Sequence, residues 1–510
     1  MTRILGLAEQ PWGSIAMQRI LKELIDKGVA SAGRFGITDN FCFLYNKEAL
    51  QVMRASSSFE ISTLEDIYWG WQLPNADSLR VRQAADFTEK WIQSVRPRRS
   101  KTVLERTNRD LFADERDFFY LATGDEWKSI IFADTLRWCT ELFDDFEPEF
   151  VIALERSTLA INICYELAMS RGIEFQTIIQ SRIGSRWVIR DDFGLGTSNA
   201  LVERAVALLA DEDLESRAVA LIEKTIAQRN GSYASLEADV TRELLLGKDK
   251  YFTTLLADIL RLSKSIYNRI PLQRNGLACK PIRLEQNFFK LSVWQIKGLI
   301  HRHLHILGLR LWGSTKSPPG RHFAWALHAR PEGSVKVLGG GIDEIEALLN
   351  VANLLPTGVL LVVKENPEMF GYRNRGFYKR LNRHPNICLV DFTCPSADLI
   401  DSAIGVLGIS GTFLLEAAFQ GKPVMPLGRP EFDAFLSHQN SDSLSNFIRD
   451  RLNDVPLDND LSIVAYVCWV LANSSDADVP WLSDTTSPDF QLMISRIATQ
   501  IEQRLMQLKG

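Results

Sequence analysis

The stretch GVLGISGTFLLEAAFQGKPVMPLG, residues 405–428, decides the fold of this chain. The apolar segment at 406–409 predicts a short buried strand, and a Ser-Gly-Thr loop then opens a helix that ends at Gly421. The apolar segment at 423–427 predicts a second buried strand. We therefore expect a strand–loop–helix–strand unit whose loop carries no bulky side chain.

This loop has the features of a phosphate site. Ser410, Gly411 and Thr412 leave the backbone open, and the first turn of a helix offers unpaired N–H groups at the positive end of the helix dipole. Glu416 lies one helical turn beyond Thr412, where it would accept hydrogen bonds from ribose hydroxyls. The alternative is an ordinary unit in which Ser or Thr only caps the helix, because short glycine motifs often match by chance.

The surrounding sequence favours the nucleotide interpretation. From residue 322 onward, strands are predicted at 322–327, 358–363 and 387–390, and helices at 343–355, 376–383 and 396–403. Alternating strands and helices predict right-handed crossovers and a parallel sheet covered on both faces. Such sheets bind ligands beyond the carboxyl ends of their strands. We expect a Rossmann-type nucleotide domain with its site in the loops at that edge.

Two further loops at this edge carry suitable side chains. His328 and Glu332 follow the first of these strands, and we expect His328 to contact the base or the leaving group while Glu332 orders the loop. Lys364 follows the next strand and would neutralise a phosphate, with Asn366 and Pro367 beside it. The alternative for His328 is a structural ring bonded to loop carbonyls.

The order of several segments in this half resembles the capsule polysaccharide biosynthesis proteins. The segments are LHARPEGS (327–334), GGGID (339–343), LVVKENP (361–367), FYKRL (377–381), PNICLV (385–390), ISGT (409–412), LLEAAFQGKPV (414–424) and LG (427–428). The resemblance covers roughly residues 322–430. It implies an α/β fold of GT-B architecture, in which two Rossmann-like domains with helical insertions face a cleft. It also implies a bacterial glycosyltransferase, in some members a Kdo transferase that uses CMP-Kdo.

The sequence departs from the family pattern at residue 366. These proteins usually read Lys-Glu-His-Pro where this chain reads Lys-Glu-Asn-Pro at 364–367, and the family's His-Pro pair helps to hold the nucleotide. The 409–424 segment is also similar to the non-hydrolysing UDP-GlcNAc 2-epimerases, which share the architecture. The Gly-Thr-Arg-Pro-Glu opening of an epimerase is absent from the sequence.

Length and composition predict a multidomain soluble enzyme. At 510 residues the chain exceeds the size of a single core, and its net charge of −5 gives no global attraction to nucleic acid or an anionic membrane. Seven cysteines without a C-x-x-C spacing are typical of a reducing cytosol. Neither a signal peptide nor a membrane-spanning stretch is recognisable, so we expect a cytoplasmic protein. The predicted division is an N-terminal Rossmann-like acceptor domain with a helical insertion (1–200), a helical region and interdomain connection (201–316), a C-terminal Rossmann-like nucleotide-sugar domain (317–485) and a helix returning to the N-terminal domain (486–510).

Catalysis in this architecture needs a base from the N-terminal domain. Glu155 directly follows a predicted buried strand at 150–154 and is our candidate, with Asp39 and Glu9 as alternatives. Alternatively, Glu155 only caps the helix that starts near Thr158 or forms an ion pair with Arg156. Arg182 and Arg186 lie in the loop after the next strand, and their forked donors suit the carboxylate of an acidic sugar or an acceptor group. Two solvated loop arginines are the other interpretation.

No metal site is predicted. Of the cluster His301, His303 and His305, the first and last lie one helical turn apart and could reach one ion. No carboxylate or third ligand is nearby in the sequence, whereas zinc needs three or four ligands. The Asp-x-Asp patterns at 211–213 and 458–460 are read as solvated carboxylates. Segment 288–312, in which cationic and aromatic residues alternate with aliphatic ones, fits either a peripheral membrane contact or an interdomain helix packed on the core.

The sequence therefore predicts a metal-independent glycosyltransferase without a cofactor. It would move a sugar from a nucleotide-activated donor, for example CMP-Kdo or another acidic sugar, to a surface polysaccharide or a lipid-linked glycan. The alternatives are a nucleotide-sugar epimerase of the UDP-GlcNAc 2-epimerase type and a glycan-assembly partner that has lost its chemistry.

Overall fold

The computed structural model describes most of both ends of the chain. The described residues are 2–8, 10–37, 60–63, 82–84, 86–88, 90–91, 125–154, 159–191, 199–227, 256, 259–260, 263–264, 296, 300, 320–328, 339, 342–366, 369, 373, 376–390, 394–436, 443–456, 461–477, 479–480 and 483–509. Every structural statement below refers to these residues.

The N-terminal half of the described chain forms a six-stranded sheet in the order β3-β2-β1-β4-β5-β6. Its strands are β1 (Thr2–Ala8), β2 (Ala30–Ile37), β3 (Glu60–Thr63), β4 (Phe150–Leu154), β5 (Glu174–Gln180) and β6 (Trp187–Arg190). All pairs are parallel except β5 with β6, which form an antiparallel hairpin. This is the strand order of a Rossmann sheet, with its reversal between β1 and β4.

The C-terminal half forms a second, five-stranded sheet in the order β11-β10-β7-β8-β9. Its strands are β7 (His322–Ala326), β8 (Leu360–Lys364), β9 (Ile387–Leu389), β10 (Gly405–Gly408) and β11 (Val424–Pro426), and they are all parallel. The order reverses between β7 and β10, because the chain moves outward through β8 and β9 and then returns to the other side of β7. Both sheets therefore have the same kind of topological switch point.

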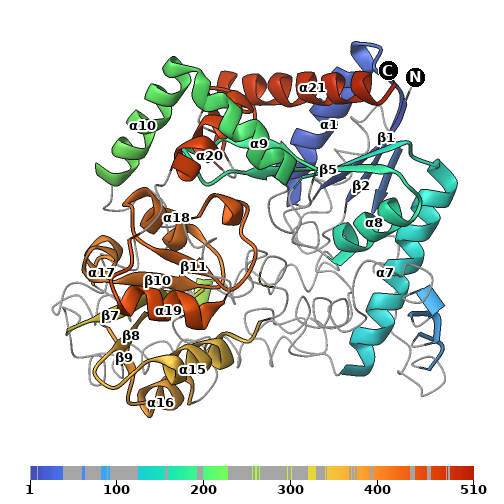
Figure 1. Cartoon of the computed structure of the whole chain (residues 1–510). Helices are drawn as coiled ribbons and strands as arrows, with labels where there is room; N and C mark the ends of the chain where they lie inside the picture. The colour runs from blue at the N-terminus through green and yellow to red at the C-terminus, as the bar shows by residue number, and fades with distance from the viewer. Residues whose placement is uncertain are drawn as a thin grey trace.

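Helices cover both sheets (Figure 1). Those of the first half are α1 (Gln10–Asp26), α7 (Asp125–Phe146), α8 (Leu159–Ser170), α9 (Asn199–Ala207) and α10 (Glu212–Ala227), with a short 3₁₀ helix at Leu208–Ala210. Those of the second half are α15 (Glu344–Leu354), α16 (Phe377–Asn382), α17 (Ser396–Ser402), α18 (Thr412–Phe419), α19 (Leu444–Leu452), α20 (Leu461–Ala472) and α21 (Pro488–Lys509), with a 3₁₀ helix at Asp433–Phe435. The predicted fold class is confirmed: the protein is α/β with two Rossmann-like sheets, which is the arrangement that GT-B denotes.

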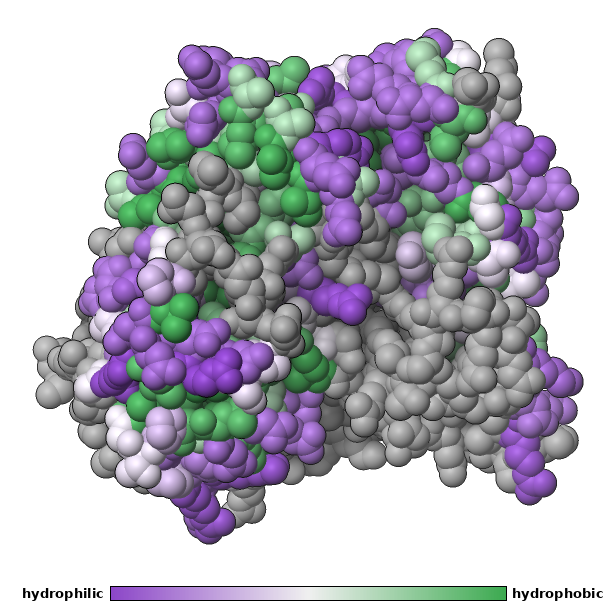
Figure 2. Space-filling model, viewed as in Figure 1, coloured by the Kyte–Doolittle hydropathy of each residue, from purple (hydrophilic) through white to green (hydrophobic). Residues whose placement is uncertain are grey.

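The last part of the chain returns to the first sheet. α20 packs against α9 and α10, and α21 lies along α1 (Figure 1). The indole N–H groups of Trp12 and Trp187 donate to the carbonyls of Ser483 (3.0 Å) and Val479 (2.8 Å). Apolar residues gather on the surface over α9, α10 and α20 (Figure 2). The predicted boundaries of the four segments stay a prediction.

Several strands of the N-terminal sheet were not predicted from the sequence. One of them is β2 at Ala30–Ile37, which follows α1. Periodicity missed β2 because its sequence, ASAGRFGI, has few large apolar residues, and Arg34 pairs with Glu60 of β3 at 2.9 Å. The β6 strand was also not predicted. Within the described residues, no helix is long and apolar enough to cross a bilayer.

Candidate functional site

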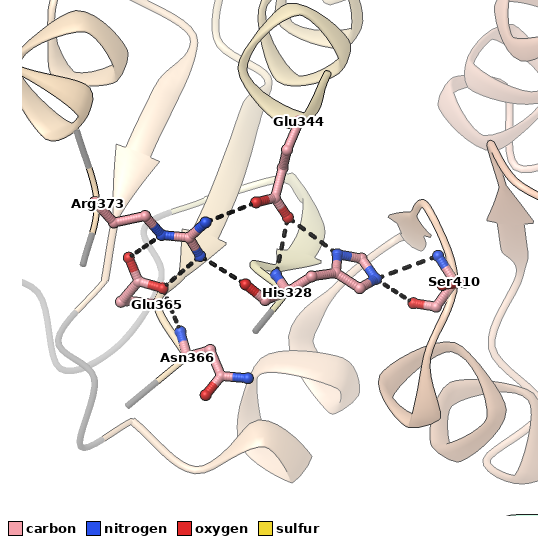
Figure 3. A network of polar contacts seen from close by, with 6 residues as sticks. All are labelled: His328, Glu344, Glu365, Asn366, Arg373 and Ser410. Carbon is pink, nitrogen blue, oxygen red and sulfur yellow. Dashed lines mark hydrogen bonds and ion pairs between the residues drawn. The ribbon is translucent and has the colours of Figure 1, made fainter. Parts of the chain in front are cut away.

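The candidate site lies at the switch point of the C-terminal sheet. His328 comes two residues after β7, and Ser410 comes two residues after β10, the strand that pairs with β7. The His328 Nε2 atom lies 2.5 Å from the carbonyl oxygen of Ser410 and 3.3 Å from its backbone nitrogen (Figure 3). The structure therefore brings together two of the predicted loops at the position where open α/β sheets bind ligands.

Bare backbone forms the surface of the Ser410–Thr412 loop. Gly411 is the N-cap of α18 with a φ of 103°, a conformation that favours glycine, and no side chain caps the helix among the described residues. A Cβ atom at Gly411 would lie 3.5 Å from Nε2 of His328. Ser410 is buried, whereas Gly411 and Thr412 are partly exposed. The first turn of α18 thus has no side-chain cap among the described residues, and its binding of an anion stays a prediction.

Behind this loop, Glu344 binds His328. Glu344 is the first residue of α15, and its Oε1 accepts from the backbone N–H of His328 (2.8 Å) and contacts its Nδ1 (3.0 Å). Its Oε2 accepts from Nη1 of Arg373 at 3.0 Å. Burial alone would raise the pKa of Glu344, but Arg373 and His328 outweigh burial and lower this pKa to about 2. Glu344 is therefore a buried carboxylate that stays ionised.

Arg373 joins Glu344 to a second buried carboxylate, Glu365, which follows β8. The Nη2 and Nε atoms of Arg373 donate to the two oxygens of Glu365 at 2.8 and 3.1 Å, and Nη2 also reaches the carbonyl of His328 at 2.8 Å. Tyr378 of α16 donates its hydroxyl to Glu365. Burial and the neighbouring Glu365 raise the pKa of Tyr378 well above its usual value, so the hydroxyl keeps its proton. We call His328, Glu344, Glu365, Arg373 and Tyr378 the buried charge network.

The sequence analysis identified only His328 in this network. Glu365 lies in the Lys-Glu-Asn-Pro segment, in which the sequence predicted Lys364, Asn366 and Pro367 as site residues but not Glu365. In the structure the backbone N–H of Asn366 donates to Glu365 at 2.6 Å. The available signal was the position of Glu344, Glu365 and Arg373 in segments at the carboxyl ends of predicted strands. Their pairing across 29 and 8 residues could not be read from the sequence.

The other predicted residues of the C-terminal site lie near the same edge. Lys364 is the last residue of β8, and its Nζ donates to Ser396 Oγ at the start of α17 (2.9 Å). The side-chain amide of Asn366 points away from Glu365 (Figure 3). Glu416 lies in the second turn of α18 and is partly exposed. Glu332 and Pro367 lie outside the described residues.

Three of the N-terminal candidates lie outside the described residues, and two lie within them. Glu9 and Glu155 come directly after β1 and β4, the two strands at the switch point of the first sheet, but both residues lie outside the description, as does Asp39. Arg182 is exposed with a φ of 62°. Arg186 binds the carbonyl of Ser475 (2.5 Å) and the carboxylate of Asp476 (3.3 Å). The Arg186 guanidinium is thus bound by residues of the segment that connects α20 and α21.

Metal-site candidates gain no structural support within the described residues. Asp211 of the first Asp-x-Asp pattern accepts from the backbone N–H of Leu214 at 3.1 Å and caps α10. The described residues contain no cluster of three His, Cys, Asp or Glu side chains able to hold an ion. The second pattern at 458–460 and the histidines His301, His303 and His305 lie outside the description.

Comparisons with known proteins add only distant similarity. No family model matches the chain, and no curated protein matches it. Solved structures that align include a UDP-GlcNAc 2-epimerase from Neisseria meningitidis (12% identity, 99% of this chain and 100% of that chain, TM-score 0.26). A β-Kdo 2,7-transferase from Thermosulfurimonas dismutans aligns at 14% identity over 73% of this chain and 90% of that chain (TM-score 0.29). A spinosyn rhamnosyltransferase aligns at 12% identity over 93% and 97% (TM-score 0.24). Such low scores carry no argument about function.

Proposed function

We propose that this protein is a GT-B glycosyltransferase that transfers a sugar from a nucleotide-activated donor to a glycan acceptor without a metal ion. The observation that supports the proposal most directly is the uncapped Ser410–Thr412 loop, which opens α18 at the switch point of the C-terminal sheet. An anionic group fits a helix N-terminus with bare backbone, and a nucleotide fits the crevice of a Rossmann-like sheet.

The residues at this edge suit the departure of a nucleotide. Transfer breaks the bond between the anomeric carbon and a phosphate oxygen, so negative charge develops on the leaving phosphate. The N–H groups of α18 and the ammonium of Lys364 would stabilise this charge more strongly than they bind the intact donor. Glu416 would hold the ribose hydroxyls. Glu155 would remove the proton of the attacking acceptor hydroxyl.

The resemblance to capsule polysaccharide proteins motivates the finer assignment. On this proposal the donor carries an acidic sugar such as Kdo, and the acceptor is a surface polysaccharide or a lipid-linked glycan. The exposed Arg182 would then bind the sugar carboxylate or the acceptor. Segment 288–312 would hold the enzyme at the inner face of the membrane, where a lipid-linked acceptor lies.

A nucleotide-sugar epimerase is the second candidate, favoured by the similarity of 409–424 to the UDP-GlcNAc 2-epimerases. The two reactions differ in their requirements. Epimerisation changes the nucleotide sugar without a second substrate, whereas transfer releases free nucleotide only when an acceptor glycan is present. Product analysis with and without an acceptor therefore separates them.

The first test is calorimetric titration of the purified protein with CMP, UDP, GDP and CMP-Kdo in the absence of divalent metal. Preference for CMP and CMP-Kdo supports transfer of an acidic sugar. Preference for UDP keeps a nucleotide-sugar enzyme and moves the choice toward the epimerase. Absence of binding to all four would overturn the proposed function and leave a glycan-assembly partner.

The catalytic assignment needs its own variant. Glu155→Gln should lower turnover by about 100-fold or more, because general base catalysis contributes on that order. Nucleotide affinity should stay unchanged, since the base acts on the acceptor. Turnover near that of the wild type would remove Glu155 as the base and direct the search to Glu9 and Asp39.

A further inference from the structure

The contacts of His328 define its protonation state. Its Nε2 atom lies 2.5 Å from the Ser410 carbonyl oxygen and 3.3 Å from the Ser410 nitrogen. The Ser410 backbone N–H also points at Nε2, and one ring nitrogen cannot donate and accept at the same time. The carbonyl oxygen is the nearer of the two groups and only accepts, so this contact favours a proton on Nε2. The Nδ1 atom faces the ionised Glu344 carboxylate at 3.0 Å, which also only accepts. The two contacts together favour a ring with a proton on each nitrogen.

Charge balance within the buried charge network agrees with this assignment. Glu344 and Glu365 contribute two negative charges, and Arg373 contributes one positive charge. Counted over the five described residues of the network, a neutral His328 would leave one buried negative charge uncompensated, which is costly at low dielectric. A protonated His328 makes the network neutral, and its side chain is itself only 6% exposed.

The contact with Ser410 also fixes the direction of the next N–H group. The Ser410–Gly411 peptide is planar and trans, so its carbonyl and its N–H point to opposite sides. Because the carbonyl is directed at His328, the N–H of Gly411 is directed away from the buried charge network. This orientation adds the Gly411 N–H to those of the first turn of α18 as a donor for an anion.

We propose that His328 is a positioning residue: a buried imidazolium, held by Glu344 and Arg373, that donates to the Ser410 carbonyl and thereby turns the Ser410–Gly411 peptide into its anion-binding orientation. On this inference His328 does not touch the nucleotide. It acts through the phosphate loop, and its positive charge lies behind the loop on the side opposite to the ligand. The inference rests on the proposed function only for the identity of the anion, a nucleotide phosphate.

The first experiment reads the ring directly. In protein labelled with ¹⁵N-histidine, an imidazolium has two nitrogens with nearly equal chemical shifts, whereas a neutral ring has two widely separated shifts. The His328 signals are assigned by their loss in His328→Gln. His322, at the opposite end of β7, is an internal reference for a neutral ring, because burial lowers its pKa. An imidazolium pattern at neutral pH supports the proposal, and a neutral pattern overturns it, whether or not any nucleotide binds.

The second experiment measures the affinity for CMP and UDP by calorimetry in three variants. His328→Phe keeps the size of the ring but removes the donor, so the dissociation constant of the better-bound nucleotide should rise about tenfold or more. His328→Gln retains an N–H near the position of Nε2 and should recover most of the affinity. His384→Gln removes a histidine that contacts Asn353 outside the network and should leave binding unchanged.

Two results would overturn the positioning role. One is wild-type affinity in His328→Phe. The other is an equal loss in His328→Phe and His328→Gln, which points to direct contact between the imidazole and the ligand. If the wild-type protein binds neither CMP nor UDP, the proposed function fails, while the ring signals still decide the protonation of His328.

Discussion

Single residues at the C-terminal switch point are buried with their charges intact because they share partners. Arg373 reaches Glu344 and Glu365 at once, and each carboxylate accepts at least three hydrogen bonds. Several bonds to ionised groups offset the loss of hydration, whereas a single unpaired charge at this depth would not be stable. The removal of one charged partner should therefore lower the free energy of unfolding by more than its ion pair contributes to stability, because the other charge stays buried without compensation.

Replacement of Arg373 tests this dependence. Arg373→Met leaves two carboxylates buried without their guanidinium and should lower the free energy of unfolding by about 3–5 kcal/mol. Arg449→Met is the matched control, because Arg449 pairs with Asp450 at 3.7 Å while its side chain is 65% exposed; its cost should stay below about 1 kcal/mol. Denaturant unfolding measures both. Similar costs for the two variants would show that the network does not depend on Arg373.

Acid should destabilise the protein through Glu344. Its pKa falls from 4.5 to about 2 on folding, so the unfolded chain binds more protons than the folded protein between these values. The stabilisation by ionised Glu344 is then complete above pH 4.5 and is lost as the pH falls toward 2. The stability difference between the wild type and Glu344→Gln, measured by denaturant unfolding at several pH values, should shrink across this window. A difference independent of pH would refute the low pKa of Glu344.

Sequence patterns predicted the position of residues that directly follow a strand. Ser410, Lys364 and His328 were expected at the carboxyl edge of the C-terminal sheet, where the structure has them, because each follows a predicted apolar strand; their roles stay predictions. Glu344 and Arg373 were missed because their role depends on partners that only the folded chain brings together. Neither a charged residue at the start of a helix, such as Glu344, nor one between elements, such as Arg373, gives a sequence signal of its own burial.

At the scale of elements, the two ends of α18 differ in their surroundings although each carries a glycine with a positive φ. Gly411 opens the helix with a φ of 103° beside His328, and Gly421 follows its end with a φ of 66° and open space around it. Both positions favour glycine, but only the first adjoins the proposed anion site.

Alanine at each end should separate strain from binding. Gly411→Ala and Gly421→Ala should each lower the free energy of unfolding by about 1–2 kcal/mol, because a Cβ atom is disfavoured at positive φ. Only Gly411→Ala should weaken nucleotide binding, since it changes the backbone at the phosphate loop. Calorimetry and thermal unfolding of both variants measure these effects. If Gly411→Ala and Gly421→Ala bind the nucleotide with equal affinity, the Ser410–Thr412 loop is not part of the nucleotide site.

Elements with strong apolar segments were predictable, and others were not. The unit at 405–428 was predicted because β10 is buried throughout, β11 is buried except for a partly exposed Met425, and the segments around both strands are continuous apolar runs. The β2 strand escaped because its sequence is rich in small and polar residues, and it is held by pairing with β1 and β3 on either side. Tertiary pairing thus replaced the local signal on which sequence patterns depend.

At the scale of the whole molecule, contacts between distant segments hold the chain together. The two Rossmann-like sheets could be predicted, because alternating strands and helices permit few topologies. The hydrophobic core shared by β5, β6, α10, α18 and α20 could not, because no sequence pattern states which helix faces pack against each other. The contact of α21 with α1 joins the last helix of the chain to the first.

The contact between α21 and α1 allows a test with two residues of one helix. Ile497 of α21 is 1% exposed in the core formed with α1 and the first sheet, whereas Leu492 of the same helix is 52% exposed. Ile497→Ala should lower the free energy of unfolding by about 2–5 kcal/mol, because the removed methyl and methylene groups leave a cavity between the two ends of the chain. Leu492→Ala removes similar apolar volume from the solvent-facing side and should cost less than about 0.5 kcal/mol. Denaturant unfolding of both variants gives the comparison. A small cost for Ile497→Ala would mean that α21 contributes little to the first sheet, and the return of the chain would then be dispensable for stability.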